Sequence, residues 1–327
     1  MKRRMLLGAL LIAAVVISGC VKAQIRLFTD ATVPFAEYTL EGTGDEKILL
    51  IPIKGRIADG PSRGFLRDRP GLVENVVAQL RKAEEDPQIK ALIIKIDSPG
   101  GSVTAIDILY HELQAYRART QVKIVALFMG LAASGGYYVA LPADHIVAHP
   151  TSITGSVGVI FLTPRVDGLM TKIGVAVDVN KSGRNKDTGS PFRPRTAEEE
   201  ALFQDLTDQL AGRFLDLVAR HRQPTPAALE EIKTARIFLA PQALELGLVD
   251  KIGYASEALE AARQEAGLAA DARVVVYRRN EYPDDTVYNS AAHGGAPKPA
   301  VVDIGLPAGI LDNGTGFHYL WSPAATE

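Results

Sequence analysis

The sequence is poor in the residues that carry redox and metal chemistry. Its 327 residues include one cysteine and six histidines. A single cysteine excludes an intrachain disulfide, and the histidines show none of the spacings typical of zinc sites. No glycine-rich segment ends in the lysine of a phosphate loop. We therefore expect neither a metal nor any other cofactor.

An excess of charge of one sign is also missing. The 36 basic residues nearly balance the 38 acidic ones, and aromatic residues make up only 6% of the chain. No cluster of Lys and Arg is interleaved with aromatic residues, which argues against nucleic acid as a partner. The 47% of hydrophobic residues is typical of a globular protein. The length predicts one or two domains, and we find no internal repeat.

The one long apolar run lies at the amino terminus. Residues 2–4 are basic and residues 5–17 are apolar, a stretch shorter than the ~20 residues of a spanning helix. Residues 17–20, ISGC, resemble a lipobox, and they contain the only cysteine, Cys20. We therefore expect residues 1–20 to be a signal peptide with lipidation at Cys20. The alternative is an uncleaved signal anchor. Both predict a membrane-anchored protein whose body faces the extracytoplasmic side.

The rest of the chain alternates between apolar strand patterns and amphipathic helix patterns. This alternation predicts an α/β fold, with a parallel sheet and crossover helices, over residues 46–280. Residues 21–45 are expected to be a linker with a lead-in strand. Residues 281–327 form a Gly/Pro-rich tail, whose apolar Tyr319, Leu320 and Trp321 are expected to dock on the body. The predicted strands are 47–55, 91–97, 122–130, 145–149, 175–180 and 273–279, and the predicted helices are 70–86, 103–117, 132–143, 167–174, 196–221, 241–249 and 255–267.

Ser134 is a candidate nucleophile because it follows a predicted strand among small residues. Small neighbours let a substrate backbone approach, and the N–H group of Gly135 could donate to an oxyanion beside the Ser134 hydroxyl. The turn DSPGGS at residues 97–102 exposes the N–H groups of Gly100 and Gly101 at a helix start in the same way. Taken alone, these motifs also fit close helix packing and an ordinary strand-to-helix turn.

A serine nucleophile needs a base. None of the histidines lies in a motif with a partner carboxylate. Lys186, in the loop KSGRNKD at residues 181–187, is the alternative. The reference pKa of a lysine amine is ~10.4, so a lysine base requires burial or nearby positive charge. Taken alone, Lys186 also fits a solvated loop residue.

Four motifs together resemble one family of proteases. They are DSPGGS, MGLAASGGYYVA at 129–140, ADHIVAHPTSITGSVGV at 143–159 and KSGRNKD, in this order. The later segment RIFLAPQALELGLVDKIG at 236–253 fits the same pattern. The chain thus resembles the short form of bacterial signal peptide peptidase A, a family of Ser/Lys proteases, over roughly residues 45–280.

The resemblance implies a ClpP/crotonase-like fold of repeated ββα units and a catalytic dyad. It implies that Ser134 is the nucleophile, that Lys186 is the general base and that Ser156 orients the lysine amine. It implies that the oxyanion is held by backbone N–H groups of Gly135 and of Gly100 or Gly101. It also implies a homo-oligomeric ring, in which the serine and the lysine of one site can come from neighbouring protomers.

The expected function is that of a membrane-tethered serine endopeptidase. Its substrates would be cleaved signal peptides and other short or unfolded apolar peptides. Two alternatives stay open. A crotonase-like enzyme acting on acyl-CoA shares the fold but needs neither Ser134 nor Lys186. An inactive ring that binds peptides as a scaffold would not react with a serine-directed label.

Overall fold

The computed structural model describes residues 33–60, 70–282, 284–289 and 316–321. The chain divides into a unit that ends at Pro34 and a compact unit from Phe35 to Glu327, which is the one described below. Cys20 and the predicted signal peptide lie outside the described residues. None of the helices in the described ranges has the length and apolarity needed to cross a membrane.

A mostly parallel sheet of nine strands forms the centre of this unit. The order is β1-β11-β2-β3-β5-β6-β10, with β7 beside β5 and β9 beside β7. Strand β2 is buried at every position except its last, as expected for a parallel strand covered on both faces. The bounds are β1 Ala36–Glu41, β2 Lys47–Lys54, β3 Ile89–Ser98, β5 Lys123–Ala133, β6 His145–Ala148, β7 Ile153–Gly155, β9 Ile237–Leu239, β10 Lys251–Ile252 and β11 Arg273–Arg278.

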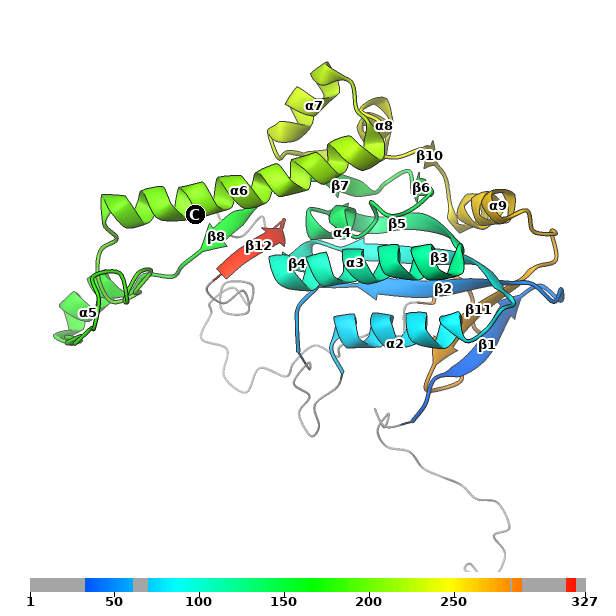
Figure 1. Cartoon of the computed structure of the whole chain (residues 1–327), viewed down its shortest axis with the longest axis horizontal. Helices are drawn as coiled ribbons and strands as arrows, with labels where there is room; N and C mark the ends of the chain where they lie inside the picture. Colours follow the sequence, from blue (N-terminus) through cyan, green and yellow to red (C-terminus); the bar gives the residue numbers. More distant parts are fainter. Residues whose placement is uncertain (1–32, 61–69, 283, 290–315, 322–327) are drawn as a thin grey trace, which may run out of the picture. The chain divides into compact units, whose positions relative to one another are not determined.

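Helices cover both faces of this sheet and make three layers (Figure 1). Helices α2 (Leu72–Glu84), α3 (Val103–Thr120) and α4 (Gly135–Tyr138) pack on one face through the larger core cluster. Helix α9 (Ala255–Ala266) covers the other face. Helix α6 (Ala197–Arg222) adds Phe214 to the larger cluster and is followed by α7 (Pro226–Lys233) and α8 (Ala240–Glu245).

The helix predicted at 132–143 is too long, because β5 continues to Ala133 and α4 has a single turn. The alanines before Ser134 form the end of the strand, and the two glycines after it form the start of this turn. The chain therefore changes direction at Ser134 itself.

A three-stranded sheet lies beside this turn. It contains β4 (Gly100–Ser102), β12 (Gly316–Leu320) and β8 (Ile160–Leu162), with β12 in the middle and antiparallel to both neighbours. In Figure 1, β12 (red) lies between β8 and β4. Tyr319 has no exposed surface, so the predicted docking of the apolar segment 319–321 is confirmed.

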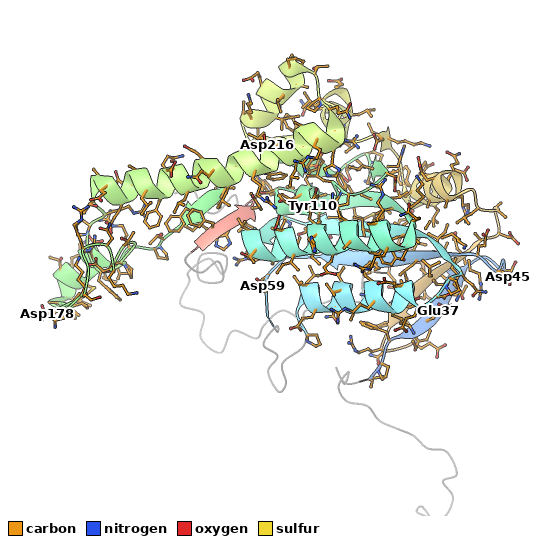
Figure 2. All side chains as sticks on the ribbon, viewed as in Figure 1. Glu37, Asp45, Asp59, Tyr110, Asp178 and Asp216 are labelled. Atoms are coloured by element: carbon orange, nitrogen blue, oxygen red, sulfur yellow. The ribbon has the colours of Figure 1, made fainter. Side chains whose placement is uncertain are left out.

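Residues 163–202, here called the arm, join β8 to the first turns of α6 and include helix α5 (Asp167–Ile173). Figure 2 labels Asp178 within it. The strand predicted at 175–180 is absent. Its alternating valines fit a strand pattern, but no described strand of the chain pairs with them, and a lone strand leaves its backbone groups unpaired. Val175, Val177 and Val179 are instead exposed.

Candidate active site

Ser134 occupies a strained position at the junction of β5 and α4. Its φ of 52° and ψ of −117° lie outside the regions that L-residues favour. Such a conformation costs about 1–3 kcal/mol and persists only where the surroundings enforce it. Here the Ser134 N–H donates to the Gly155 carbonyl at 2.8 Å, and the Ser134 carbonyl accepts from Tyr137 at 2.9 Å. This turn therefore fixes the direction of the serine hydroxyl.

Small residues around Ser134 are required by close packing. A Cβ at Gly135 would lie 2.0 Å from Ile106 Cδ1, and a Cβ at Gly136 would lie 2.5 Å from the Ser98 carbonyl oxygen. Both distances are shorter than any normal contact. The Ser134 side chain itself is 1% exposed, and its Oγ lies 3.5 Å from the Gly158 carbonyl oxygen, at the long limit of a hydrogen bond.

Ser156 lies beside Ser134 because β5 and β7 run in register. Ala133 pairs with Gly155, and each serine directly follows its paired residue. Ser156 also has a positive φ, 52°, and its N–H donates to the Arg236 carbonyl at 2.8 Å. The structure thus brings the predicted nucleophile and the predicted orienting serine together. Ser156 opens onto a cavity of about 840 Å³, lined among others by Gly158, Val159, Phe161, Arg195, Phe203, Leu320 and Trp321.

The predicted oxyanion glycines lie next to one another. Gly100 has a φ of +97°, and a Cβ there would lie 2.7 Å from the Gly135 nitrogen. The Gly100 N–H already donates to Ser98 Oγ at 3.1 Å, and Ser98 Oγ donates in turn to the Gly55 carbonyl. This leaves Gly101 as the better donor of the DSPGGS turn, with Gly135 as the second.

Lys186 lies in the arm and not beside Ser134. Its side chain is exposed, and its ammonium has no hydrogen-bond or ion-pair partner among the described residues. The single chain therefore brings together every predicted site residue of the folded unit except the predicted base.

The loop that carries Lys186 is nevertheless fixed. Asp187 accepts from Arg193 at 2.9 Å and from Lys181 at 2.6 Å, and these two cations hold the pKa of its carboxyl far below the usual range. Arg193 also pairs with Glu199 at 2.6 Å. Glu199 caps α6 through the Thr196 N–H, so the loop is tied to the start of that helix. Lys186 is thus presented on an ordered support.

A second lysine, Lys95, was not predicted from the sequence to be unusual. Lys95 lies inside the apolar run of β3, and burial, followed by repulsion from Arg278 and Lys54, lowers its pKa to about 8. The sequence signal for this buried amine is the position of the lysine inside the apolar run ALIIKID at residues 91–97. Its amine donates to the carbonyls of Val287 at 2.6 Å and Asn289 at 3.2 Å. Its strand neighbours Ile94 and Ile96 belong to the core cluster on the α4 face, so Lys95 points to the opposite face, away from Ser134.

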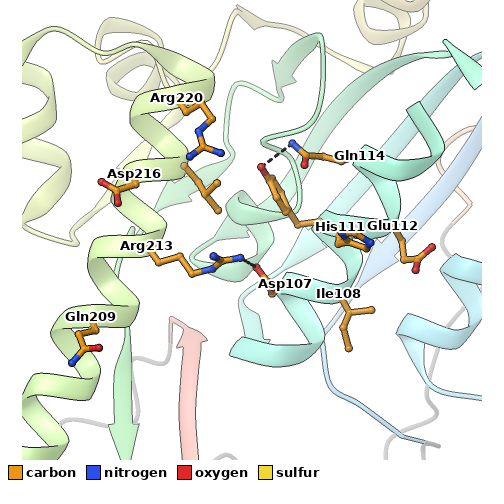
Figure 3. Close-up of a pocket in the computed structure, with 11 residues that line it drawn as sticks. Asp107, Ile108, His111, Glu112, Gln114, Gln209, Arg213, Asp216 and Arg220 are labelled. Carbon is orange, nitrogen blue, oxygen red and sulfur yellow. Dashed lines mark hydrogen bonds and ion pairs between the residues drawn. The ribbon is translucent and has the colours of Figure 1, made fainter. Parts of the chain in front are cut away.

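Two of the described histidines, His221 and His149, have partners of their own. The ring of His221 bonds to the Tyr110 hydroxyl at 2.8 Å, beside a cavity of about 700 Å³ between α3 and α6 (Figure 3). His149 bonds to Thr151 at 2.9 Å. Within the described ranges, no three His, Cys, Asp or Glu side chains are grouped as metal ligands. Neither His221 nor His149 is placed to act on Ser134.

Comparisons with known proteins agree with the resemblance that the sequence motifs indicate. The model of peptidase family S49 matches residues 117–269, and that of Clp protease matches residues 69–152. A predicted signal peptide peptidase SppA of Enterococcus faecium is 35% identical over 246 residues, 75% of this chain and 71% of that protein. A predicted protease of Synechocystis is 37% identical over 226 residues, 69% of this chain and 76% of that protein. Protease 4 of Haemophilus influenzae is 32% identical over 295 residues, 88% of this chain and 47% of that protein. The Clp protease match and the mostly parallel sheet confirm the predicted fold class.

Proposed function

Because the chain belongs to peptidase family S49, a family of serine proteases, we propose that Ser134 and Lys186 form its catalytic dyad. The observation that carries this proposal is the strained turn at Ser134, which is followed by Gly135 next to Gly100 and lies in register with Ser156. A strained residue beside backbone N–H groups is typical of a nucleophile with an oxyanion site.

In the proposed reaction, neutral Lys186 takes the proton of the Ser134 hydroxyl, and Ser134 Oγ attacks a peptide carbonyl. The N–H groups of Gly135 and Gly101 donate to the oxyanion, which is often worth ~3 kcal/mol per donor. Lys186 then gives the proton to the leaving amine, and the peptide bond breaks. Water hydrolyses the acyl-enzyme and restores both groups. Ser156 is proposed to hold the amine in position.

Lys186 is proposed to act on Ser134 of a neighbouring copy within a ring. The arm that carries it exposes a set of large apolar side chains, which is unusual for a free surface. Covering them in an interface would remove water around Lys186, and burial favours the neutral form of an amine. The exposed residues are Leu169, Ile173, Val175, Val177, Val179, Phe192 and Leu202.

The proposed substrates are cleaved signal peptides and other short or unfolded apolar peptides. One relative is named a signal peptide peptidase, which supports this choice. The proposed lipid anchor at Cys20 would hold the protein at the membrane, on the extracytoplasmic side, where such peptides are released. Folded proteins are unsuitable, because the Ser134 side chain is only 1% exposed.

The proposal is tested with the full-length chain and a fluorogenic apolar peptide between pH 6 and pH 10. We expect Ser134→Ala and Lys186→Ala each to lower kcat/KM by at least about a thousandfold. Lys172→Ala is the matched control, since Lys172 is another exposed lysine of the arm. Wild-type kcat/KM should rise with pH as the amine loses its proton. Full activity of Lys186→Ala would overturn the dyad.

A further inference from the structure

The cavity beside Ser156 contains a positive charge that has no ionic partner. Arg195, near the end of the arm, lines this cavity of about 840 Å³. The residue is half-buried, and its guanidinium forms no hydrogen bond or ion pair with any residue that the structure describes. Glu200 lines the same cavity but makes no ion pair with Arg195. An unpaired cation therefore lies at the cavity next to the candidate active site.

The other arginines of the arm are all paired. Each of them lies within 3.0 Å of a carboxylate oxygen that also belongs to the arm. The pairs are Arg165–Asp167, Arg184–Glu198 and Arg193–Glu199. Carboxylates are thus available in this segment, and Arg195 is the one arginine of residues 163–202 that is left without one.

Two aromatic rings hold the guanidinium of Arg195 in place. Phe161 of β8 and Phe203 of α6 stack with their centroids 4.1 Å apart. The Arg195 Cζ lies 5.2 Å from the centroid of Phe203 and 5.9 Å from that of Phe161, which is the range of a cation–π contact. This contact fixes the position of the charge without giving its N–H groups a hydrogen-bond acceptor.

The chemistry of Arg195 selects a carboxylate as its ligand. A guanidinium presents paired N–H donors that match the two oxygens of a carboxylate, and such bonds are among the strongest in proteins. The half-buried position beside two rings screens the charge less than open solvent does. A carboxylate bound here would lie in the cavity onto which Ser156 opens, and Ser156 lies in register with Ser134.

We propose that Arg195 is a specificity-determining residue, which binds a carboxylate of the peptide substrate in this cavity. The inference rests on the proposed function, since it assumes that peptides bind there. The carboxylate could belong to an Asp or Glu side chain or to the free end of the peptide. A cleaved signal peptide carries such an end. Both sources offer the same group to Arg195, and the experiment separates them.

The experiment measures peptide binding without cleavage, using the full-length Ser134→Ala variant and fluorescence anisotropy of labelled apolar peptides. The parent peptide is amidated and contains no acidic residue. One derivative has a free terminal carboxylate, and a second set carries Glu in place of Gln at each position in turn. We expect at least one carboxylate peptide to bind about tenfold more tightly than its neutral counterpart. The derivative that gains affinity identifies the source of the carboxylate.

Arg195→Met in the same background removes the charge and keeps an unbranched apolar chain over the two rings. It should abolish the preference for the carboxylate and leave the Kd of the neutral peptide within about threefold. Arg165→Met is the matched control, since Arg165 is an arginine of the arm that pairs with Asp167 and does not line the cavity. It should keep the preference. If no carboxylate peptide is preferred, or if Arg195→Met keeps the preference, the inference is overturned.

Kinetics with otherwise wild-type protein provide the second readout. Arg195→Met should raise KM about tenfold for the preferred carboxylate peptide, with kcat unchanged and little effect on the neutral peptide. A residue that only packs against the rings would change both peptides alike, and that result would overturn the specificity role. If Ser134→Ala discriminates between the peptides but the wild type cleaves none of them, the proposed function is contradicted and carboxylate binding by Arg195 stands.

Discussion

At the scale of single residues, the close approach of neighbouring main-chain atoms determines which residues can flank Ser134. Gly136 is the clearest case, because its missing side chain would meet the main-chain carbonyl of Ser98 and no flexible atom could move aside. The small-residue motif therefore has a structural cause beside its proposed catalytic one.

Gly136→Ala tests this cause. A Cβ 2.5 Å from the Ser98 oxygen forces the turn or β3 to shift, and we expect the free energy of unfolding to fall by about 2 kcal/mol. Gly168→Ala is the control, since nothing lies within 4 Å of a Cβ at that helical position. It should change stability by less than about 1 kcal/mol. Urea denaturation of both variants gives the comparison, and equal effects would contradict the packing argument.

Ser156 is expected to position the base without reacting itself. Ser156→Ala should lower kcat by about tenfold to a hundredfold and shift the pH dependence of kcat/KM towards higher pH, because the amine loses an oriented partner. KM should change little. A pH profile identical to that of the wild type would show that Ser156 serves packing alone.

The sequence was sufficient to predict most of this residue-level arrangement. Ser134, Ser156 and the glycines stand in short motifs, and the turns that hold them bring them together. The choice between Gly100 and Gly101 could not be predicted, because it depends on the Ser98 hydroxyl that occupies the Gly100 N–H. The burial of Lys95 could not be predicted either, because only the fold shows on which face of β3 its side chain lies.

At the scale of elements, long apolar runs were predictable and short strands were not. Strands β2, β3 and β5 and helices α2, α3, α6 and α9 carry clear periodic patterns over many residues. Strands β4, β8 and β9 have three residues each and exist through their pairing with distant segments. The segment 175–180 is the opposite case. Its sequence has a clear strand pattern, but no described strand of the chain pairs with it.

The exposed valines of that segment make the arm the expected interface. Val177→Asp places a charge on a side chain that is 47% exposed in the single chain. It should leave the fold intact but dissociate the proposed ring and abolish activity, because a buried charge without a partner is costly. Light scattering measures the mass.

Leu244→Asp provides the comparison for Val177→Asp. Leu244 is 40% exposed on α8, outside the arm, so its substitution should change neither mass nor activity. If the Val177→Asp variant keeps the wild-type mass, the arm is not part of the interface.

At the scale of the whole molecule, Lys95 couples stability to pH. Its folded-state pKa of about 8 lies below the ordinary lysine value of 10.5, so between these values the unfolded state binds more protons than the folded state. The free energy of unfolding should therefore receive a contribution that rises with pH across this window and is constant on either side. Denaturation of wild type and Lys95→Met at several pH values between 7 and 11 measures it.

Lys95→Met should flatten that rise. Lys90→Met, an exposed lysine of the same strand, should leave it in place. Parallel pH dependences for wild type and Lys95→Met would contradict the burial of a charged amine at this position.

The separation of Lys186 from Ser134 in one chain makes assembly the central claim. The most direct test co-expresses full-length Ser134→Ala and Lys186→Ala, each inactive alone, in equal amounts. If Lys186 acts on the serine of a neighbour in a head-to-tail ring, about a quarter of the sites contain both groups, and about a quarter of the wild-type activity returns. If the mixed rings form and stay inactive, the two residues do not act across subunits, and the account is contradicted.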